Sequence, residues 1–318
     1  MTVLVLTKRF DPTADYVVED LNHRGVDVFR CDPGDFPSTL TVSGVLSPSG
    51  AGWSTLLAAS GRKLSMEDVS GVYYRRPSAF HLGDIPEPVA QWANGEARMG
   101  FNGLLMADAR WLNHPQRIGY AEYKPVQLQE AVRAGLTVPR TVITNDPSAA
   151  RALADEVGEI IYKPLSTPVL PEGVAAGRLL YTAVVTPEHL AEAEGVTATA
   201  HMFQERVKHT GAVRLTVVDG QMFAAAIQAA TDAARLDWRA DYSALTYEVV
   251  SVPEAVRRGV VSLMAALGLR FGAFDFLVTT EGWTFLEVNP NGQWAWIEDR
   301  TGLPIAAAIA TALAPGSC

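Results

Sequence analysis

Three oxygen-bearing side chains near the end of the sequence have types and spacing that suit a divalent metal ion. Glu287 and Asn289 are two residues apart in the apolar run FLEVN, which predicts a strand carrying both side chains on one face. Asp275 lies in a second apolar run, AFDFLV, which predicts the partner strand of a hairpin. Burying an unpaired carboxylate is costly, and two facing carboxylates repel unless a cation lies between them. Two carboxylates and a carboxamide oxygen therefore predict a Mg²⁺ site.

The turn of this hairpin decides whether Asp275 faces the other two side chains. A two-residue turn at Glu281-Gly282 would place Asp275 opposite Val288. A three-residue turn over 280–282, with a left-handed glycine, would pair Asp275 with Glu287. We predict the three-residue turn. The alternative is that the two carboxylates simply form the solvent-facing side of an edge hairpin.

The first third of the chain predicts a small parallel α/β domain. Val3–Leu6 and Val26–Phe29 are predicted strands that flank a helical pattern over Asp15–Asn22, and this β-α-β order is typical of parallel sheets. Short alternating runs at Leu40–Val45 and Trp53–Leu57 suggest a meander. A further strand and a helix are predicted over Val72–Arg76 and Pro86–Ala109. The character of the sequence changes near residues 113–115, where we place a domain boundary.

The remaining two thirds predict an α/β segment followed by antiparallel strands. Asp219-Gly220 between two apolar runs is a strong signal for a hairpin turn, and Gly268 marks the end of a helix that begins at Pro253. The predicted helices are Lys124–Ala134, 146–158 and Pro253–Leu267. The predicted strands are Val138–Ile143, Ile160–Lys163, Met202–Val207, Val213–Val218, Met222–Ile227, Gly272–Thr279 and Trp283–Asn289.

Composition narrows the class of protein. The 318 residues are 48% hydrophobic and 19% charged, values typical of a folded protein with two or three subdomains. The formal net charge of -9 argues against general binding to nucleic acid or to an anionic membrane. The two cysteines, Cys31 and Cys318, form neither a disulfide framework nor a zinc pattern, and no signal peptide or membrane span is evident. We therefore expect a cytoplasmic protein.

The string FLEVNPNGQWAWIE with an upstream GAFDF resembles the metal-binding signature of the ATP-grasp superfamily. More narrowly, the chain resembles the ATP-grasp maturases of ribosomal peptides, the microviridin-type or graspetide macrocyclases, and especially their actinobacterial branch. YYRRP (73–77), the span 113–146 and DWR (237–239) support the narrower match. The resemblance implies an N-terminal pre-grasp α/β domain over 1–112, a central α/β subdomain over 113–200 and a C-terminal antiparallel-sheet subdomain over 201–318.

The resemblance also implies roles for individual residues. Lys124 and Lys163 correspond to the lysines that reach the phosphates of ATP, and Arg214 corresponds to the arginine of the phosphate site. The strand Gln204-Glu205-Arg206-Val207 resembles the hinge that binds the adenine edge. Asp275, Glu287 and Asn289 take the places of the metal ligands. The resemblance therefore implies that the protein binds ATP together with two Mg²⁺ ions. One departure is the segment 165–178, which has two prolines and only Gly173 and Gly177, so that a phosphate-cradling role for it is in doubt.

The chemistry of a ligase indicates further residues. A carboxylate must take the terminal phosphoryl group, and a nucleophile must then displace phosphate from the acyl phosphate. Asp237 and Arg239 are two residues apart in the DWR sequence. Arg239 could hold the carboxylate or the acyl phosphate, and Asp237 could accept the proton of the nucleophile, unless the two form only a surface ion pair. Arg235 is an additional candidate for the phosphate. Arg75-Arg76 could bind an acidic peptide or serve equally well as a structural anchor to the central domain.

The preferred function is an ATP-dependent ligase that closes ester or amide macrocycles between side chains of a ribosomal precursor peptide. An alternative is an amino-acid ligase that resembles the glutamate-adding ligases of ribosomal proteins. A third hypothesis, from a different class, is a nucleotide-binding regulator without turnover, which would have eroded lysines or metal ligands. The expected partner is the precursor peptide, and the family suggests a homodimer.

Overall fold

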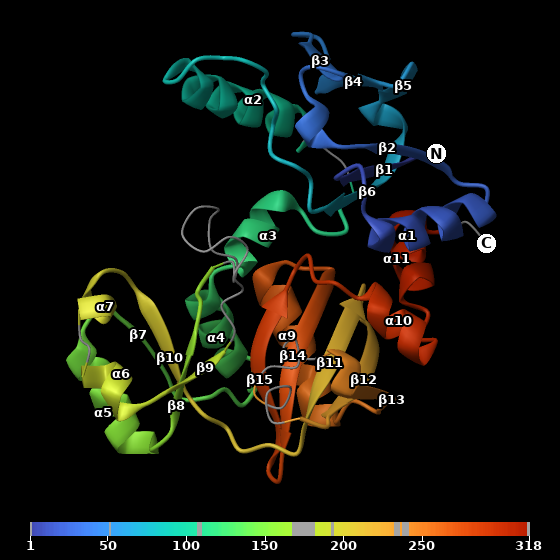
Figure 1. The fold of residues 1–318 in the computed structure, drawn as a ribbon. Coiled ribbons are helices and arrows are strands. Elements are labelled where there is room, and N and C mark those ends of the chain that lie inside the picture. The colour runs from blue at the N-terminus through green and yellow to red at the C-terminus, as the bar shows by residue number, and fades with distance from the viewer. Residues whose placement is uncertain are drawn as a thin grey trace.

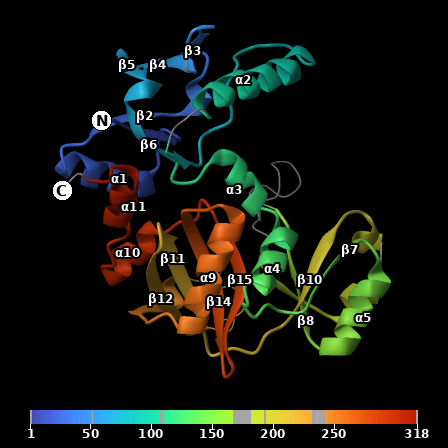
Figure 2. The ribbon, with the colours of Figure 1, turned by 180° about the vertical axis from the view of Figure 1, so that it is seen from behind.

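The structure is a computed structural model that describes residues 2–50, 52–106, 110–166, 182–191, 194–231, 236 and 242–316. Among these residues, no helix combines the length and the apolar character needed to cross a membrane. Figures 1 and 2 show, from opposite sides, an N-terminal part that lies over two further sheets. Short 3₁₀ helices occur at Pro33–Asp35, Met66–Asp68 and Tyr242–Ala244.

The N-terminal part is built on a three-stranded parallel sheet in the order β2-β1-β6. The central strand β1 is buried along its whole length, as its continuous apolar run predicts. Val3 and Val5 face one core with helix α1, while Leu4 and Leu6 face a second core with the meander β3-β4-β5 and helix α2. The bounds are β1 (Thr2–Thr7), α1 (Pro12–His23), β2 (Asp27–Cys31), β3 (Leu40–Leu46), β4 (Trp53–Ala59), β5 (Arg62–Ser65), β6 (Val69–Arg75) and α2 (Val89–Leu105). The predicted β-α-β opening and the predicted meander are confirmed.

The last two helices of the chain return to this N-terminal sheet. Helix α10 (Ala295–Thr301) leads into α11 (Ile305–Leu313), which lies beside α1 in both views. Ile305, Ile309 and Leu313 are fully buried in the same core as Val3 and Val5. The alanine-rich sequence of α11 suits this position, because small side chains allow a close approach to the sheet. The first and last segments of the chain therefore share one core.

The central part is a four-stranded sheet in the order β7-β10-β8-β9. Strand β10 pairs with both β7 and β8, so the central sheet extends beyond residue 200, where the sequence-based division placed the start of the third subdomain. Helix α5 packs on this sheet through Ala150 and Leu153. The bounds are α3 (Pro115–Ala121), α4 (Lys124–Arg133), β7 (Thr141–Thr144), α5 (Pro147–Val157), β8 (Ile160–Lys163), β9 (Ala183–Val185), α6 (Pro187–Ala191), α7 (Glu194–Thr197) and β10 (His201–Glu205).

The C-terminal part is a five-stranded antiparallel sheet in the order β13-β12-β11-β14-β15. The predicted turn at Asp219-Gly220 joins β11 to β12, and both residues have the positive φ angles that a two-residue hairpin turn requires. Helix α9 packs on one face, and it ends at Gly268 in the left-handed conformation, as predicted. The bounds are β11 (Gly211–Val218), β12 (Gln221–Ala229), β13 (Leu245–Val249), α9 (Glu254–Leu267), β14 (Phe271–Thr279) and β15 (Gly282–Asn289).

The contact between β6 and α11 depends on the absence of a side chain at Gly71. A Cβ atom at Gly71 would collide with the backbone carbonyl of Leu313. We expect Gly71→Ala to lower the free energy of unfolding by about 1–3 kcal/mol, because the backbone of α11 must shift. Gly103→Ala is the matched control, since a Cβ at this exposed position of α2 meets no atom within 4 Å. The control should stabilise the protein by about 0.5–1 kcal/mol. Urea unfolding measures both, and equal effects would contradict this view of the packing.

Candidate functional site

A cavity of about 960 Å³ is lined by residues of both the central and the C-terminal sheets. This volume falls within the roughly 300–1,000 Å³ of sites that hold small molecules and cofactors. The chain passes from one sheet to the other along the wall of the cavity, through residues 206–210 between β10 and β11. Nine of the residues singled out from the sequence line the cavity: Lys124, Lys163, Gln204, Glu205, Arg206, Val207, Asp275, Glu287 and Asn289.

Other residues that the sequence indicated lie elsewhere. Arg214 is almost completely buried and lies behind Asp275, to which it donates a hydrogen bond. Arg235, Asp237 and Arg239 lie outside the residues that the structure describes, as does most of the segment 165–178.

The hairpin β14–β15 brings Asp275 opposite Glu287, but not through the turn that we predicted. Thr279 pairs with Gly282, so the loop consists of two residues, Thr280 and Glu281, and the predicted three-residue turn is wrong. The register then shifts by one residue beyond Phe276, where Leu286 is the extra residue of a β-bulge. Only after this bulge does Asp275 pair with Glu287, and Ala273 with Asn289.

The residue spacing in the sequence explains why this hairpin needs a bulge. An odd number of residues separates Asp275 from Glu287, so a regular ladder closed by a two-residue turn cannot pair them. Phe285 and Val288 are both buried in the core shared with α9, although their spacing of three residues does not fit a regular strand. Leu286 and Glu287 both line the cavity instead. This spacing was the signal for a bulge.

Each carboxylate of the pair is held by a cation from a different element. Arg214 of β11 donates from Nη1 to Oδ1 of Asp275 at 2.8 Å, and the two residues are direct neighbours in the ladder between β11 and β14. Lys124, the first residue of α4, forms an ion pair with Glu287. The side chains of Asp275 and Glu287 are 16% and 34% exposed. Oxygen donors at this accessibility, with cations beside them, fit a divalent metal and an anionic ligand.

The end of β10 and the start of the connection that follows it are fixed to the central sheet. The amide of Gln204 is buried and donates from Nε2 to Oγ1 of Thr141 at 2.9 Å. The backbone N–H of Glu205 donates to the carbonyl of Arg140 at 2.9 Å, and that of Arg206 donates to the carbonyl of Glu159, also at 2.9 Å. This part of the cavity wall is therefore positioned by hydrogen bonds to Thr141, Arg140 and Glu159.

Two buried amides that the sequence analysis missed hold the strands of the hairpin. Gln127 of α4 donates from Nε2 to the carbonyl of Val288 and accepts from its N–H, both at 2.9 Å, so it pairs with the outer edge of β15 as a further strand would. Asn113 donates from Nδ2 to the carbonyls of Phe271 and Pro290 at 2.7 and 2.9 Å. A polar residue on the buried side of a helix was the only signal for Gln127, and its partner could not be read from the sequence.

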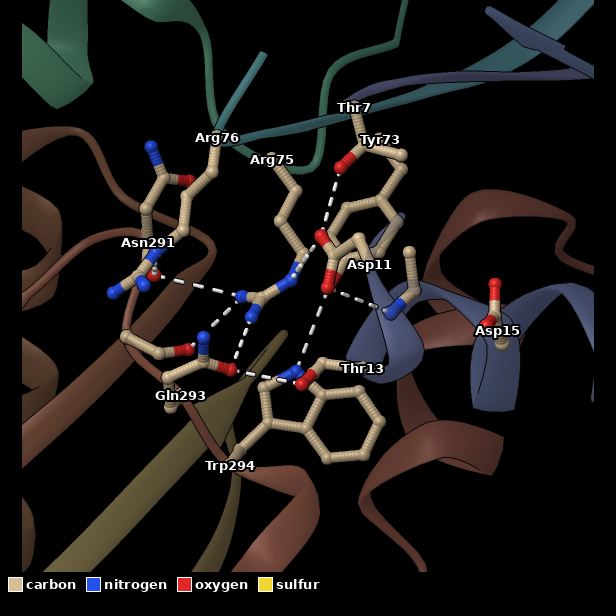
Figure 3. A network of polar contacts seen from close by, with 12 residues as sticks. Thr7, Asp11, Thr13, Asp15, Tyr73, Arg75, Arg76, Asn291, Gln293 and Trp294 are labelled. Atoms are coloured by element: carbon tan, nitrogen blue, oxygen red, sulfur yellow. Dashed lines mark hydrogen bonds and ion pairs between the residues drawn. The ribbon is translucent and has the colours of Figure 1, made fainter. Parts of the chain in front are cut away.

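The paired arginines at the end of β6 have different surroundings, which Figure 3 shows. Arg75 is 1% exposed; its Nε lies 3.0 Å from Oδ2 of Asp11, and it donates from Nη1 to the carbonyl of Gly292 at 3.2 Å. Arg76 is exposed and donates from Nε to the carbonyl of Asn291 at 3.3 Å. Although its side chain reaches solvent, partial desolvation against the protein and the neighbouring positive charge of Arg75 lower the pKa of Arg76. The burial of Arg75 fits the anchoring alternative rather than peptide binding, although its anchor is the segment after β15 and not the central sheet.

The ion pair at Asp275 should contribute to stability as a buried pair does. Removing one partner of a buried pair costs about 3–5 kcal/mol, whereas an exposed pair contributes about 0–1 kcal/mol. We expect Arg214→Leu to lower the free energy of unfolding by an amount in the first range. Arg140→Leu, which breaks the exposed pair of Arg140 with Glu156, should cause a much smaller loss. Urea unfolding of both single variants and of the double variant Arg214→Leu/Asp275→Asn measures these losses of unfolding free energy. Equal losses for the two single variants would disprove it.

Comparison with known proteins identifies the family to which this fold belongs. The model of the MvdD pre-ATP-grasp domain matches residues 2–119, and that of the RimK-like ATP-grasp domain matches residues 121–313. Two curated relatives, described as probable alpha-L-glutamate ligases of Shewanella halifaxensis (strain HAW-EB4) and Shewanella pealeana (strain ATCC 700345 / ANG-SQ1), are 26% and 25% identical over 201 residues. That region is 62% of this chain and 43% of each relative, so the chain spans less than half the length of these curated relatives.

Solved structures resemble the chain over nearly its whole length. The macrocyclase MdnC of Microcystis aeruginosa MRC, bound to its precursor peptide MdnA, is 28% identical with a TM-score of 0.86, over 98% of this chain and 99% of that one. A RiPP-associated ATP-grasp ligase of Chryseobacterium gregarium, in complex with ADP and with a leader and core peptide, is 25% identical with a TM-score of 0.89, over 98% and 96%. The macrocyclase MdnB of Microcystis aeruginosa MRC is 31% identical with a TM-score of 0.80, over 99% of both chains. This protein therefore belongs to the RimK-like ATP-grasp family.

Proposed function

We propose that this protein is an ATP-dependent ligase that activates Asp or Glu side chains of a precursor peptide and joins them to side-chain hydroxyls or amines of the same peptide. The observation that carries the proposal is the pairing of Asp275 with Glu287 on the wall of a cavity large enough for a nucleotide. The similarity of nearly the whole chain to peptide macrocyclases supports a peptide as the substrate.

The residues that line the cavity suit Mg–ATP. Asp275, Glu287 and Asn289 would hold the metal, and two carboxylates with an amide oxygen are a donor set that would suit two Mg²⁺ ions. Lys124 and Lys163 would bind the phosphates, and residues 204–207 would bind the adenine edge. Arg214 would act behind Asp275, holding its carboxylate in place. When bound, Mg²⁺ offsets the charge that develops on the phosphoryl group during its transfer.

The reaction has two steps. A side-chain carboxylate of the peptide takes the terminal phosphoryl group of ATP, which gives an acyl phosphate and ADP. A hydroxyl or amine of the peptide then attacks the acyl carbon, phosphate leaves, and a base accepts the proton of the nucleophile. We assign the base to Asp237 and the binding of the acyl phosphate to Arg239, with Arg235 and Arg76 as further contacts to substrate. Leu236, the neighbour of Asp237 in the chain, lines the cavity, which supports this assignment.

A second candidate function has its own support. The curated relatives are described as probable alpha-L-glutamate ligases, and an enzyme of that type would join an amino acid to a carboxylate of its acceptor. Both functions use the same acyl phosphate, so the nucleotide cavity does not separate them. The product does, because cyclisation removes one water from the peptide whereas ligation adds a residue to it.

The experiment that tests the function is incubation with ATP, Mg²⁺ and the candidate precursor peptide, followed by mass spectrometry. We expect the peptide to lose the mass of one water for each ring and to form one ADP for each ring, because every bond requires one activation. Free glutamate is added to a parallel reaction. A gain of glutamate residues in that reaction would support the second function, and an unchanged peptide in both reactions would refute both proposals.

The metal ligands can be tested without a peptide. We expect Asp275→Asn and Glu287→Gln each to weaken Mn²⁺ binding to the complex with the ATP analogue AMPPNP by more than the roughly 10–100-fold typical of residues outside the coordination sphere. Glu281→Gln is the matched control, since Glu281 is an exposed carboxylate in the turn of the same hairpin. Electron paramagnetic resonance of free Mn²⁺ measures the binding. Wild-type affinity in both ligand variants would remove these residues from the metal site.

A further inference from the structure

A buried polar network joins the N-terminal sheet to the segment that follows β15. Figure 3 shows the guanidinium of Arg75 between Asp11 on one side and Gln293 on the other. The side chains of Arg75 and Asp11 are 1% and 4% exposed. Arg75 donates from Nη2 to Oε1 of Gln293, and Thr13 donates from its hydroxyl to the same oxygen at 2.8 Å. Gln293 is thus held by two donors from the N-terminal part of the chain.

Both carboxylate oxygens of Asp11 have further partners. Its Oδ2 accepts a hydrogen bond from the hydroxyl of Thr7 at 2.7 Å, and its Oδ1 accepts one from the N–H of Ala14 in the first turn of α1. The carboxylate is therefore fixed by β1, by α1 and by Arg75 together. A buried ion pair held this rigidly can set the position of what it touches, and by itself it gives little net stability.

The same segment reaches the carboxylate of Asp275 through a single arginine. The backbone carbonyl of Gln293 accepts a hydrogen bond from Nη2 of Arg214 at 2.9 Å, while Nη1 of Arg214 donates to Asp275 at 2.8 Å. The side chain of Gln293 thus faces the N-terminal part, and its backbone faces the cation that holds Asp275.

The packing between these groups leaves little room for movement. A Cβ atom at Gly292 would lie 2.9 Å from Nη2 of Arg214 and 3.3 Å from the Cβ of Asn289. The absence of a side chain at residue 292 therefore allows the segment to lie directly against Arg214 and the last residue of β15. The nearest atom to such a Cβ would be the Cβ of Ala273 on β14, at 2.4 Å, so the segment has no room to move closer to β14 or to Arg214.

We propose that Asp11, Arg75 and Gln293 are positioning residues that set the geometry of the metal site, with Gln293 as the link between the N-terminal domain and Arg214. The proposal rests on the proposed function in one respect, namely that Asp275 and Asn289 bind metal. Arg75 holds Gln293, Gln293 holds Arg214, and Arg214 orients Asp275. The N-terminal domain thereby contributes to the metal site, although none of its residues lines the cavity among those that the structure describes.

The test uses substitutions at Gln293 and measures metal binding to the full-length protein. Gln293→Met keeps the backbone carbonyl and most of the volume but removes the acceptor for Arg75 and Thr13. Gln293→Glu keeps an acceptor oxygen for both donors. We expect Gln293→Met to weaken Mn²⁺ binding to the AMPPNP complex by about tenfold, the lower end of effects for residues outside the coordination sphere, and Gln293→Glu to bind within about twofold of wild type.

Arg24→Met is the matched control for a contact between the same parts of the chain. Arg24, the residue directly after α1, donates to the hydroxyl of Thr311 at 2.7 Å and to the carbonyl of Ala307 at 3.0 Å, both in α11 and away from the segment after β15. We expect this variant to lose as much unfolding free energy as Gln293→Met while its Mn²⁺ affinity stays within about twofold of wild type. Electron paramagnetic resonance and urea unfolding on the same samples give both quantities.

The possible results separate this proposal from the proposed function. Wild-type affinity in Gln293→Met, or an equal loss of affinity in Arg24→Met, would overturn the positioning role. A failure of Gln293→Glu to retain affinity would also count against it, because the acceptor is then not what matters. If the wild-type protein itself bound no Mn²⁺ with AMPPNP, the proposed function would fall instead.

Discussion

Asp275 and Glu287 face each other across one ladder, and the surrounding structure must compensate their two negative charges. Their negative charges repel, and burial beside a cavity wall would strengthen the repulsion. The structure supplies a cation to each carboxylate from outside the hairpin: Arg214 comes from β11 and Lys124 from the start of α4. The strand order that places β11 beside β14, and the packing of α4 against β15, are thus the conditions under which the pair is tolerated.

The hairpin that bears this pair is at the edge of its sheet, where backbone groups would otherwise lack partners. Gln127 covers the edge at Val288, and the carbonyl of Thr137 accepts a hydrogen bond from the N–H of Phe285 at 2.8 Å. Asn113 binds the backbone on both sides of the hairpin, at Phe271 and at Pro290. Fixed edges of this kind keep ligand oxygens in place, which a site for a metal requires.

The N-terminal sheet and the last segment of the chain pack together, and both lie next to the residues that hold Asp275. Helix α11 fills the core beneath the N-terminal parallel sheet, and the segment that leads into α10 and α11 is the one that lies against Arg214. Arg75 lies at the carboxyl end of β6, where parallel sheets commonly present their functional groups. Here Arg75 holds a neighbouring segment of the protein. Arg75 is buried in this contact, whereas Arg76, which lies just beyond the strand with a φ of 44°, is exposed beside it.

The sequence by itself determined the local features of this protein. It predicted the β-α-β opening, the Asp219-Gly220 turn and both strands of the β14–β15 hairpin, because period and turn chemistry are properties of neighbouring residues. It also required one extra residue between Asp275 and Glu287. Only the tertiary structure decided that this residue is Leu286 in a bulge and not part of the turn, since Phe285 must face the core shared with α9 while Glu287 faces the cavity. The partners of Arg75, Arg214 and Gln127 were equally beyond the sequence, because such contacts join residues far apart in the chain and depend on how the sheets pack.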